Sequence, residues 1–287
     1  GPKRACNMCD SSDAYQVYVE DDGTYNASCF SCKGYDFEPF KGLTKSKVHE
    51  NRSKSRRKEN VTKLNTFTPE DILSLPICSL KDRKLDEETC RAFGVHVALS
   101  QTDGATPTSH YYPVYKNSKL TGFKERVIDG KKFFTHGDCK EPELFGQIRQ
   151  SSGKTLYITE GELDCLSVWQ TLRKNSKITD WDPSVVSISR GAATAKSDII
   201  NNYEWVNTFE KVVIIFDQDE AGRSAAIQVA KALSGKSYVV SLPEKDPNSM
   251  LELGRESDLY WAIQTKARKY KPDGIVSGAD TWERFRH

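Results

Sequence analysis

The sequence has no long apolar run, and this absence sets the first limit on the protein. Hydrophobic residues make up 37% of its 287 residues, and the mean hydropathy is −0.63. No stretch approaches the roughly 20 consecutive apolar residues that a membrane-spanning helix requires. We therefore expect no association with a membrane, and two or three domains with modest cores.

The chain also lacks a strong net charge, since 42 Lys and Arg stand against 40 Asp and Glu, a balance of +2. The charges are nevertheless segregated. Residues 45–58 carry seven basic side chains and one acid, residues 116–140 carry seven and three, and residues 151–254 are net acidic. Basic segments that flank an acidic centre suit a polyphosphate or nucleic-acid ligand. For either basic run alone, a solvated charged face is the alternative.

A nucleotide-hydrolysing P-loop is missing as well. Ser152-Gly153-Lys154-Thr155 resembles the end of that motif, but its first glycine would have to stand at Ile148. The Gly-Lys-Thr also precedes a predicted strand, whereas a P-loop requires a helix there. The sequence therefore contains no ATPase motor of this type.

Two βαβ-like segments are present in the second half of the chain. Residues 156–159 and 212–216 are short apolar runs typical of buried strands. Helical patterns follow them at residues 163–173 and 221–233. This alternation predicts a parallel sheet with helices packed on its faces.

An acidic cluster follows each of these strands. Glu160-Gly161-Glu162-Leu163-Asp164 comes directly after the first, and Asp217-Gln218-Asp219 after the second. The carboxyl ends of parallel strands meet at one edge, where ligands bind, so we expect these carboxylates to converge at exposed strand ends. Their mutual repulsion favours a bound cation, and oxygen ligands suit Mg²⁺ or Mn²⁺. The alternative is that the aspartates only cap the following helices.

The eight cysteines fall into two groups. Two Cys-x-x-Cys pairs, 19 residues apart, contain Cys6, Cys9, Cys29 and Cys32. This spacing is typical of a four-thiolate zinc ribbon. A pair of disulfides, which requires an oxidising compartment, and a redox Cys-x-x-Cys are the alternatives. The remaining cysteines are expected to be buried, unreactive thiols: Cys78, Cys90, Cys139 and Cys165.

The residues between the cysteine pairs alternate like a β-hairpin, over 15–19 and 25–28, with Asp21-Asp22-Gly23 as its turn. We predict a zinc-binding β module over residues 3–43, which is too small to fold without its metal. Residues 44–66 are polar and charged, as expected for a flexible basic linker.

The pattern over residues 67–150 predicts a separate α+β region. Thr68 and Pro69 begin a helix, and a second helix over 86–93 ends at Gly94. Three strands are predicted over 111–115, 121–127 and 132–135. Lys124 and Arg126 lie two residues apart in the second of these, so they share one face of a strand. That face could hold a triphosphate or a template strand.

Taken together, these motifs resemble those of TOPRIM domains. The resemblance rests on the Glu160 cluster, on Asp217-x-Asp219-x-Ala221-Gly222-Arg223, and on Lys245-Asp246-Pro247-Asn248. The four-cysteine ribbon narrows it to primases. Glu143-Leu144-Phe145-Gly146 and Pro272-Asp273-Gly274-Ile275-Val276-Ser277 make the chain similar to the primase half of bifunctional primase–helicases of teseptimavirus-type phages and their organellar relatives. The resemblance covers nearly the whole chain.

The resemblance implies a fold and a domain order. The catalytic core would be an α/β TOPRIM subdomain with a Rossmann-like parallel sheet, over residues 151–254. It would follow the zinc ribbon and an α+β N-terminal subdomain of the primase over residues 67–150. Residues 255–287 would lead to a helicase domain that is absent from this chain.

The resemblance also implies site residues. Glu160 matches the catalytic glutamate, a general base or metal ligand, and Asp217, Asp219 and Asp246 match magnesium-binding aspartates. Nucleotide or template binding is implied for five residues: Lys124, Arg126, Lys131, Lys132 and Asp164. One zinc ion would be held by the four ribbon cysteines: Cys6, Cys9, Cys29 and Cys32.

The implied activity is template-directed synthesis of short RNA primers from NTPs on single-stranded DNA, with the ribbon reading the template site. A TOPRIM nuclease and a non-catalytic zinc-ribbon DNA-binding protein are the alternatives. The implied partners are a hexameric helicase domain and a replicative DNA polymerase. The protein would act in the host cytoplasm if it comes from a phage, or in a mitochondrion or plastid if it is eukaryotic, and it would not be secreted.

Overall fold

The protein is described from a computed structural model, which covers residues 6, 9, 11, 12, 14–19, 25–36, 67–150, 152–178 and 180–271. Residues 1–66 and 67–287 form two separate compact units. Four predicted features lie outside the described residues: the hairpin turn 21–23, the linker 44–66, its basic run 45–58 and the stretch 272–277.

The first unit contains a small antiparallel sheet in the order β1-β2-β3. Its strands are β1 (Tyr15–Val19), β2 (Tyr25–Cys29) and β3 (Tyr35–Asp36). The predicted hairpin is confirmed, with Tyr15 opposite Cys29 and Val19 opposite Tyr25. Its described core is small and consists of four residues: Cys6, Tyr15, Ala27 and Cys29.

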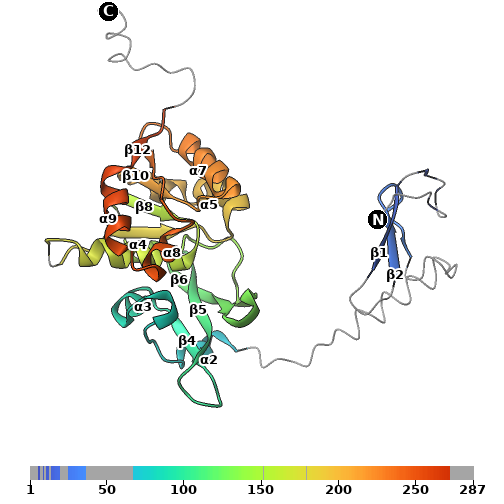
Figure 1. Cartoon of the computed structure of the whole chain (residues 1–287), viewed down its shortest axis with the longest axis horizontal. Helices are drawn as coiled ribbons and strands as arrows, with labels where there is room; N and C mark the ends of the chain where they lie inside the picture. Colours follow the sequence, from blue (N-terminus) through green and yellow to red (C-terminus); the bar gives the residue numbers. More distant parts are fainter. Residues whose placement is uncertain are drawn as a thin grey trace, which may run out of the picture. The chain divides into compact units, whose positions relative to one another are not determined.

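A five-stranded sheet forms the centre of the second unit (Figure 1). Its order is β12 (Arg268–Lys269), β11 (Ser237–Val239), β10 (Phe209–Ile215), β8 (Gly153–Thr159) and β9 (Ser184–Ser187). Four strands are parallel, and β12 pairs antiparallel with β11 at one edge. β8 and β10 contain the two predicted strands, and β8 begins at Gly153, so the Gly-Lys-Thr stretch lies in a strand.

Helices cover both faces of this sheet. One face packs against α4 (Glu162–Lys174), α8 (Pro247–Glu252) and α9 (Glu256–Thr265). The other packs against α5 (Ala195–Asn201) and α7 (Glu220–Ala232), with α6 (Tyr203–Asn207) at its margin. Both helices predicted to follow the strands are confirmed as α4 and α7. Two elements lie beyond residue 254: α9 packs on one face of the sheet, and β12 forms its edge strand.

The alternation of side chains along a strand explains the two cores. In β8, Leu156 and Ile158 join the cluster with α5 and α7, whereas Tyr157 joins the cluster with α4 and α9. In β10, Val212 joins the cluster with α5 and α7, and Val213 joins the cluster with α4 and α9. A strand buried on both faces therefore appears as a continuous apolar run in the sequence.

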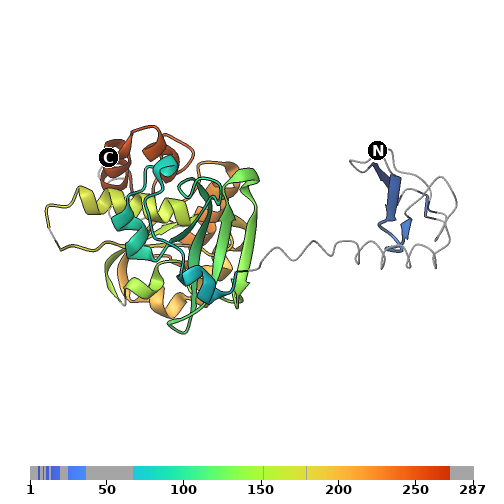
Figure 2. The same ribbon diagram turned by 90° about the horizontal axis from the view of Figure 1, so that it is seen from below.

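An antiparallel meander precedes the parallel sheet, and its strands run side by side in Figure 2. Its order is β4 (His96–Leu99), β5 (Pro107–Lys116), β6 (Lys119–Val127) and β7 (Phe133–Gly137). The β5–β6 turn places Asn117 and Ser118 at φ of 50° and 58°, as a type I′ hairpin turn requires. Asp129 and Gly130 lie in the next turn, between β6 and β7.

Two helices accompany the meander, and their ends match the sequence signals. α2 (Pro69–Leu73) begins with a capping box between Thr68 and Asp71. α3 (Glu87–Phe93) is capped by Asp86 and ends at Gly94, whose φ is 65°.

The two faces of the meander have different roles. Tyr111 and Phe123 pack against Ile72 of α2, whereas Tyr112 joins the core shared with α4. Tyr112 lies opposite Lys124 in the β5–β6 register. Lys124 and Arg126 therefore lie on the face that is turned toward the parallel sheet.

Candidate active site

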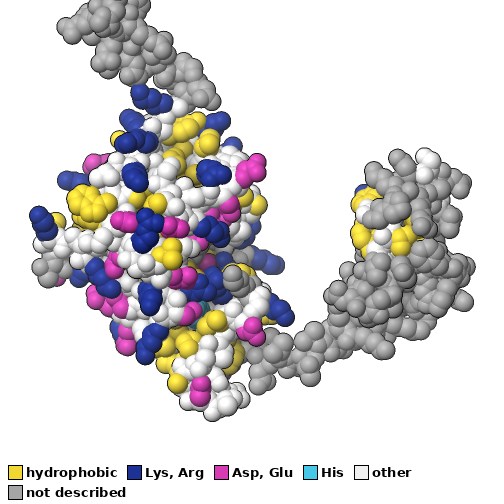
Figure 3. Space-filling model, in the orientation of Figure 1, with side chains coloured by type: hydrophobic (Ala, Val, Ile, Leu, Met, Phe, Trp, Pro, Cys, Tyr) yellow, Lys and Arg dark blue, Asp and Glu magenta, His cyan; other side chains and the backbone are white. Residues whose placement is uncertain are grey.

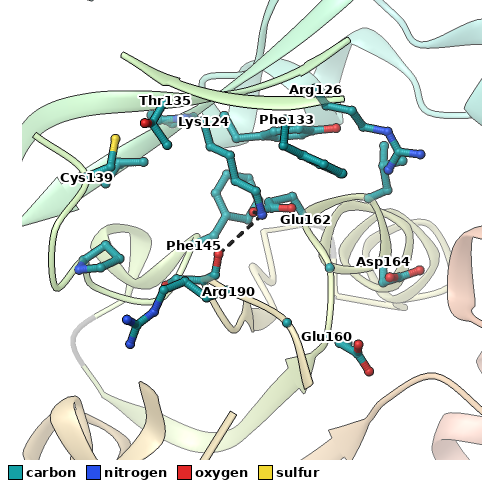
Figure 4. A pocket seen from close by; sticks show the side chains of 18 of the residues that line it. Lys124, Arg126, Phe133, Thr135, Cys139, Phe145, Glu160, Glu162, Asp164 and Arg190 are labelled. Atoms are coloured by element: carbon teal, nitrogen blue, oxygen red, sulfur yellow. Dashed lines mark hydrogen bonds and ion pairs between the residues drawn. The ribbon is translucent and has the colours of Figure 1, made fainter. Parts of the chain in front are cut away.

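The carboxyl edge of the parallel sheet and the meander together enclose a cavity of about 630 Å³ (Figure 4). Glu160 and Asp217 line it from the sheet, and Lys124 and Arg126 line it from β6. Arg190, from the loop after β9, adds a further basic side chain. Glu160, Asp217 and three basic groups thus line one space, together with the carboxylates of Glu143, Glu162 and Asp164.

Neighbouring strand ends bring the two carboxylates together. Thr159 pairs with Ile215 at the end of the β8–β10 ladder, so Glu160 and Asp217 follow at the same edge. The prediction that they lie at exposed ends was wrong in one respect, because the side chain of Asp217 is only 16% exposed. α7 and the meander cover this edge more closely than strand positions alone reveal.

This partial burial changes the acidity of both groups. Burial raises the pKa of Glu160, and the nearby charge of Asp217 raises it further. Burial also raises the pKa of Asp217, although the ammonium group of Lys245 opposes the shift. Lys245 Nζ lies 3.4 Å from Asp217 Oδ2 and 3.7 Å from Asp246 Oδ2. Two of the predicted metal-site acids therefore already face a cation.

The carboxylates nevertheless do not form a tight ligand group. Across the described part of the chain, three or more His, Cys, Asp or Glu ligand atoms lie within 4.8 Å of one another only at the four cysteines. Glu160 Oε2 is buried and has no hydrogen-bond partner. A buried carboxylate oxygen without a donor is costly unless a cation or a proton joins it. The all-oxygen donor set at this edge therefore fits Mg²⁺ or Mn²⁺.

Asp219 and Asp246 also serve as helix caps. Asp219 Oδ1 accepts the N–H of Gly222 at 2.8 Å, at the start of α7. Asp246 Oδ1 accepts the N–H of Ser249 at 2.7 Å, at the start of α8. Asp219 therefore caps the helix that follows it, as the alternative interpretation expected, and Asp246 caps α8 in the same way. Capping leaves the second oxygen of each carboxylate for another partner, because a carboxylate accepts several bonds.

One basic side chain of β6, that of Lys124, is held in place from across the cavity. Lys124 Nζ donates to Glu162 Oε1 at 2.7 Å and to the carbonyl oxygen of Ser189 at 3.3 Å (Figure 4). Arg126 lies on the same strand face and lines the same space. An anchored ammonium group beside a guanidinium can bind successive phosphates.

The four cysteines of the first unit form a compact group. Cys6 and Cys32 have sulfur atoms 3.9 Å apart, and Cys9 and Cys29 have theirs 3.7 Å apart. A tetrahedron with Zn–S bonds of about 2.3 Å has edges of about 3.8 Å, whereas a disulfide requires about 2.05 Å. Hydrogen bonding from the backbone of Cys32 lowers the pKa of Cys29 to about 6, which favours the thiolate. The group fits a tetrahedral metal ion, and none of the four cysteines forms a disulfide.

Comparisons with known proteins agree with this geometry. A family model described as Toprim-like matches residues 157–251. The DNA helicase/primase of Enterobacteria phage T3 is 29% identical over 98% of this chain. The primase fragment of the bacteriophage T7 primase-helicase protein is 28% identical, with a TM-score of 0.59, and the match covers 91% of this chain and 98% of that one.

A second solved structure contains the bacteriophage T7 lagging-strand DNA polymerase with primase domains bound to an RNA/DNA hybrid and dTTP. The match is 32% identical with a TM-score of 0.58, and it covers 68% of this chain and 94% of that one. The chain belongs to the TOPRIM primase family of phage primase–helicases. It spans about half the length of the curated relative, since the match covers 46% of the T3 protein.

Two residues predicted for nucleotide or template binding in this primase-family chain, Asp164 and Lys132, lie differently from Lys124 and Arg126. Asp164 borders the cavity but is buried, and its Oδ1 accepts the N–H of Asn248 at 3.1 Å. Burial raises the pKa of Asp164 well above its usual value, and the charge of Asp246 adds to the shift. Lys132 is exposed and does not line the cavity, and the side chain of Lys131 lies outside the described part of the chain.

Other residues at the site were not assigned a role from the sequence. Glu162 belongs to the acidic motif after β8, and its carboxylate anchors Lys124. Arg190 follows a strand that was not predicted, and its guanidinium donates to Asp198 Oδ1 at 2.8 Å. Lys245 stood in a motif without a function. Lys124 and Glu162 are 38 residues apart, and Lys245 and Asp217 also lie in different motifs, so local pattern gives no signal for these two pairs.

Proposed function

We propose that this chain is a DNA primase that synthesises short RNA primers from NTPs on single-stranded DNA. The observation that carries the proposal is the cavity in which Glu160 and Asp217 face Lys124 and Arg126. Acidic groups that can hold a divalent cation, set against basic groups that can hold phosphates, are the parts that phosphoryl transfer requires.

The chain's own residues divide the work by position. Lys124 and Arg126 bind phosphate oxygens and fix the nucleotide against β6. Glu160, whose pKa is raised by burial and by Asp217, accepts a proton or orients a ligand at the strand end. Asp217, Asp219 and Asp246 would hold Mg²⁺. When bound, the metal would lower the pKa of the primer 3′ hydroxyl and neutralise the pyrophosphate leaving group.

The surface is consistent with a catalytic body that binds nucleic acid locally. On the face drawn in Figure 3, basic and acidic side chains are interspersed over the described part of the second unit. The mixing of charges on this face favours the cavity as the place where nucleic acid is contacted. Positioning would then contribute more to the reaction than a uniform electrostatic attraction.

The remaining expectations form part of the same proposal. The four cysteines hold one structural Zn²⁺, and their module reads the template site. The partners are single-stranded DNA, NTPs, a hexameric helicase domain in the longer protein and a replicative DNA polymerase. The similarity to phage proteins supports action in the host cytoplasm. In the described part of the chain, no helix is both long enough and apolar enough to span a bilayer.

One incubation tests the proposal. The protein is mixed with single-stranded DNA, Mg²⁺ and labelled NTPs, and both the nucleotide products and the DNA length are measured. Labelled oligoribonucleotides on intact DNA support a primase. Shortened DNA without labelled products would identify the nuclease alternative, and binding without either product would identify a non-catalytic DNA-binding protein.

A further inference from the structure

Phe133 is an exposed aromatic residue in the cavity that also holds the basic and acidic side chains of the site. It begins β7 and is 51% exposed, yet it lines the same space as Lys124, Arg126 and the strand-end carboxylates. Burial of apolar surface is favourable, so an open phenyl ring in a concave site offers binding energy to a ligand with an apolar face.

The two basic side chains fix the position of this ring. Lys124 Nζ lies 5.2 Å from the ring centroid, and the guanidinium carbon of Arg126 lies 5.7 Å from it, both within the range of cation–π attraction. Arg126 is paired directly with Phe133, and Lys124 with Thr135, so the three side chains share one face of the meander. In Figure 4 the ring lies between Lys124 and Arg126.

The anchoring of Lys124 makes this arrangement rigid. Its ammonium group is held by Glu162 Oε1 at 2.7 Å and by the carbonyl oxygen of Ser189 at 3.3 Å. The ring therefore lies beside a cation that cannot swing freely. The next residue, Phe134, also lines the cavity, but it pairs with Glu125 and belongs to the opposite face of the strand. The register thus singles out Phe133 as the ring on the cationic face.

A flat apolar ring flanked by fixed cations matches the two halves of a nucleotide, its base and its phosphate. Every base has a π face, so stacking on an aromatic ring tolerates any base, whereas hydrogen bonds to base edges select one. A template-directed polymerase needs that tolerance, because the base changes at every step. We propose that Phe133 is a stacking platform for a nucleobase, with Lys124 and Arg126 neutralising the adjacent phosphate.

This inference rests on the proposed primase function, and the base can belong either to a bound NTP or to the DNA template. Two fluorescent probes separate these sources. One is a single-stranded oligodeoxynucleotide with one 2-aminopurine, and the other is 2-aminopurine riboside triphosphate. Stacking on an aromatic ring quenches this fluorophore. Affinity and quenching are measured for the whole chain with Mg²⁺ present.

Three variants complete the design. Phe133→Leu keeps apolar bulk but removes the π face, and Phe133→Tyr retains the ring. Trp261→Leu is the matched control, because this aromatic residue on α9 is 62% exposed and does not line the cavity. Phe133→Leu should weaken the binding of one probe about tenfold or more and abolish its quenching. Phe133→Tyr and Trp261→Leu should bind like the original chain.

The affected probe identifies the source of the base. Unchanged binding and quenching of both probes by Phe133→Leu would overturn the inference. A loss shared by Phe133→Tyr and accompanied by a lower Tm would also overturn it, because Phe133 would then be a packing residue. Primer synthesis is measured in parallel. If the original chain makes primers but Phe133→Leu does not change the quenching, the stacking platform alone is refuted. If Phe133→Leu changes the quenching but the original chain makes no primers, the proposed function is refuted.

Discussion

The two units of the chain are stabilised by different means. The described core of the first unit contains four residues, and two of them are cysteines that face other cysteines. The second unit buries apolar clusters on both faces of its parallel sheet. Domains of about 40 residues or fewer usually need metals or disulfides, whereas larger domains are stabilised by their hydrophobic cores. Metal dependence of the fold should therefore be confined to the first unit.

The two metal sites differ in a corresponding way. The cysteine sulfurs lie 3.7 to 3.9 Å apart in two pairs, already close to tetrahedral spacing. The carboxylates do not form a comparable group, and Lys245 balances two of them. A closed thiolate site is suited to structure, whereas carboxylates that border a cavity are suited to a metal that exchanges with substrate.

The largest expected effect comes from removing the thiolate site. Chelation or Cys29→Ser should unfold the first unit, since structural zinc supplies about 10–16 kcal/mol in small zinc-binding peptides. The second unit should keep its Tm and extend a preformed oligoribonucleotide weakly, while initiation at specific template sites is lost. All five tryptophans follow residue 66, so their fluorescence reports on the second unit alone.

Cys78→Ser is the control, because this thiol belongs to the second unit and is not a member of the cysteine group. It should leave initiation and the response to chelators unchanged. If chelation lowers the Tm reported by tryptophan fluorescence, the two units are coupled and the comparison fails. If the zinc-free protein initiates normally at the same sites, the module has a structural role only.

The next effect concerns the carboxylate site. Asp217→Asn and Glu160→Gln should each reduce primer synthesis by at least about 10²–10³-fold, because charge stabilisation of the reacting phosphates is lost. Neither should unfold the protein. Each removes a carboxylate whose pKa is raised by burial and by acidic neighbours, so stability above neutral pH should be equal or higher.

Asp258→Asn, at an exposed acid of α9 that pairs with Arg255, is the matched control. It should leave primer synthesis close to normal. Near-normal synthesis by Asp217→Asn, or the loss of a cooperative thermal unfolding transition in either site variant, would show that these carboxylates serve the fold and not the chemistry.

The contrast between the units was largely predictable from local sequence signals. The spacing of the cysteines indicated a metal module, and the paired apolar runs indicated a parallel sheet whose carboxyl edge gathers Glu160 and Asp217. Thr68 and Gly94 marked the helix ends that the structure shows. Such signals act within a few residues, where capping, period and turn geometry are decided.

What the sequence did not reveal depends on contacts between distant residues. Lys124 meets Glu162 only because the meander folds over the parallel sheet. β9 spans just four residues, so its apolar run gave too little pattern to predict a strand. Without that strand, the position of Arg190 in the loop after it could not be predicted either. Asp164 looked like a site acid, yet it is buried and accepts the N–H of Asn248. Burial and long-range pairing arise from tertiary packing, which no short window contains.

A smaller effect distinguishes the two units in acid. His110 lies on β5 in the second unit, and burial lowers its pKa to about 4. An unfolded histidine titrates near 6.5, so between these values the unfolded state binds more protons. The stability of the second unit should therefore fall as pH drops from about 6.5 toward 4, by up to about 3 kcal/mol.

Urea unfolding followed by tryptophan fluorescence at pH 7.5 and pH 5 measures this loss. His110→Phe should show less loss between the two pH values than the original chain, because it has no proton to gain. The first unit should also lose its metal in acid, through protonation of its thiolates. An equal acid sensitivity of His110→Phe would assign the loss in the second unit to other groups.

The smallest effect tests whether packing alone sets the geometry of the carboxylate site. A Cβ added at Gly222 would lie 2.3 Å from the carbonyl oxygen of Asp217 and 2.9 Å from its Cβ. Gly222→Ala should therefore push α7 away from Asp217, destabilise the second unit by about 1–3 kcal/mol and reduce primer synthesis without changing a ligand.

Ser224→Ala, exposed on the same helix, is the control. Normal synthesis by a destabilised Gly222→Ala would mean that the site tolerates displacement. Reduced synthesis at full stability would mean that the close approach of α7 serves the chemistry rather than the fold.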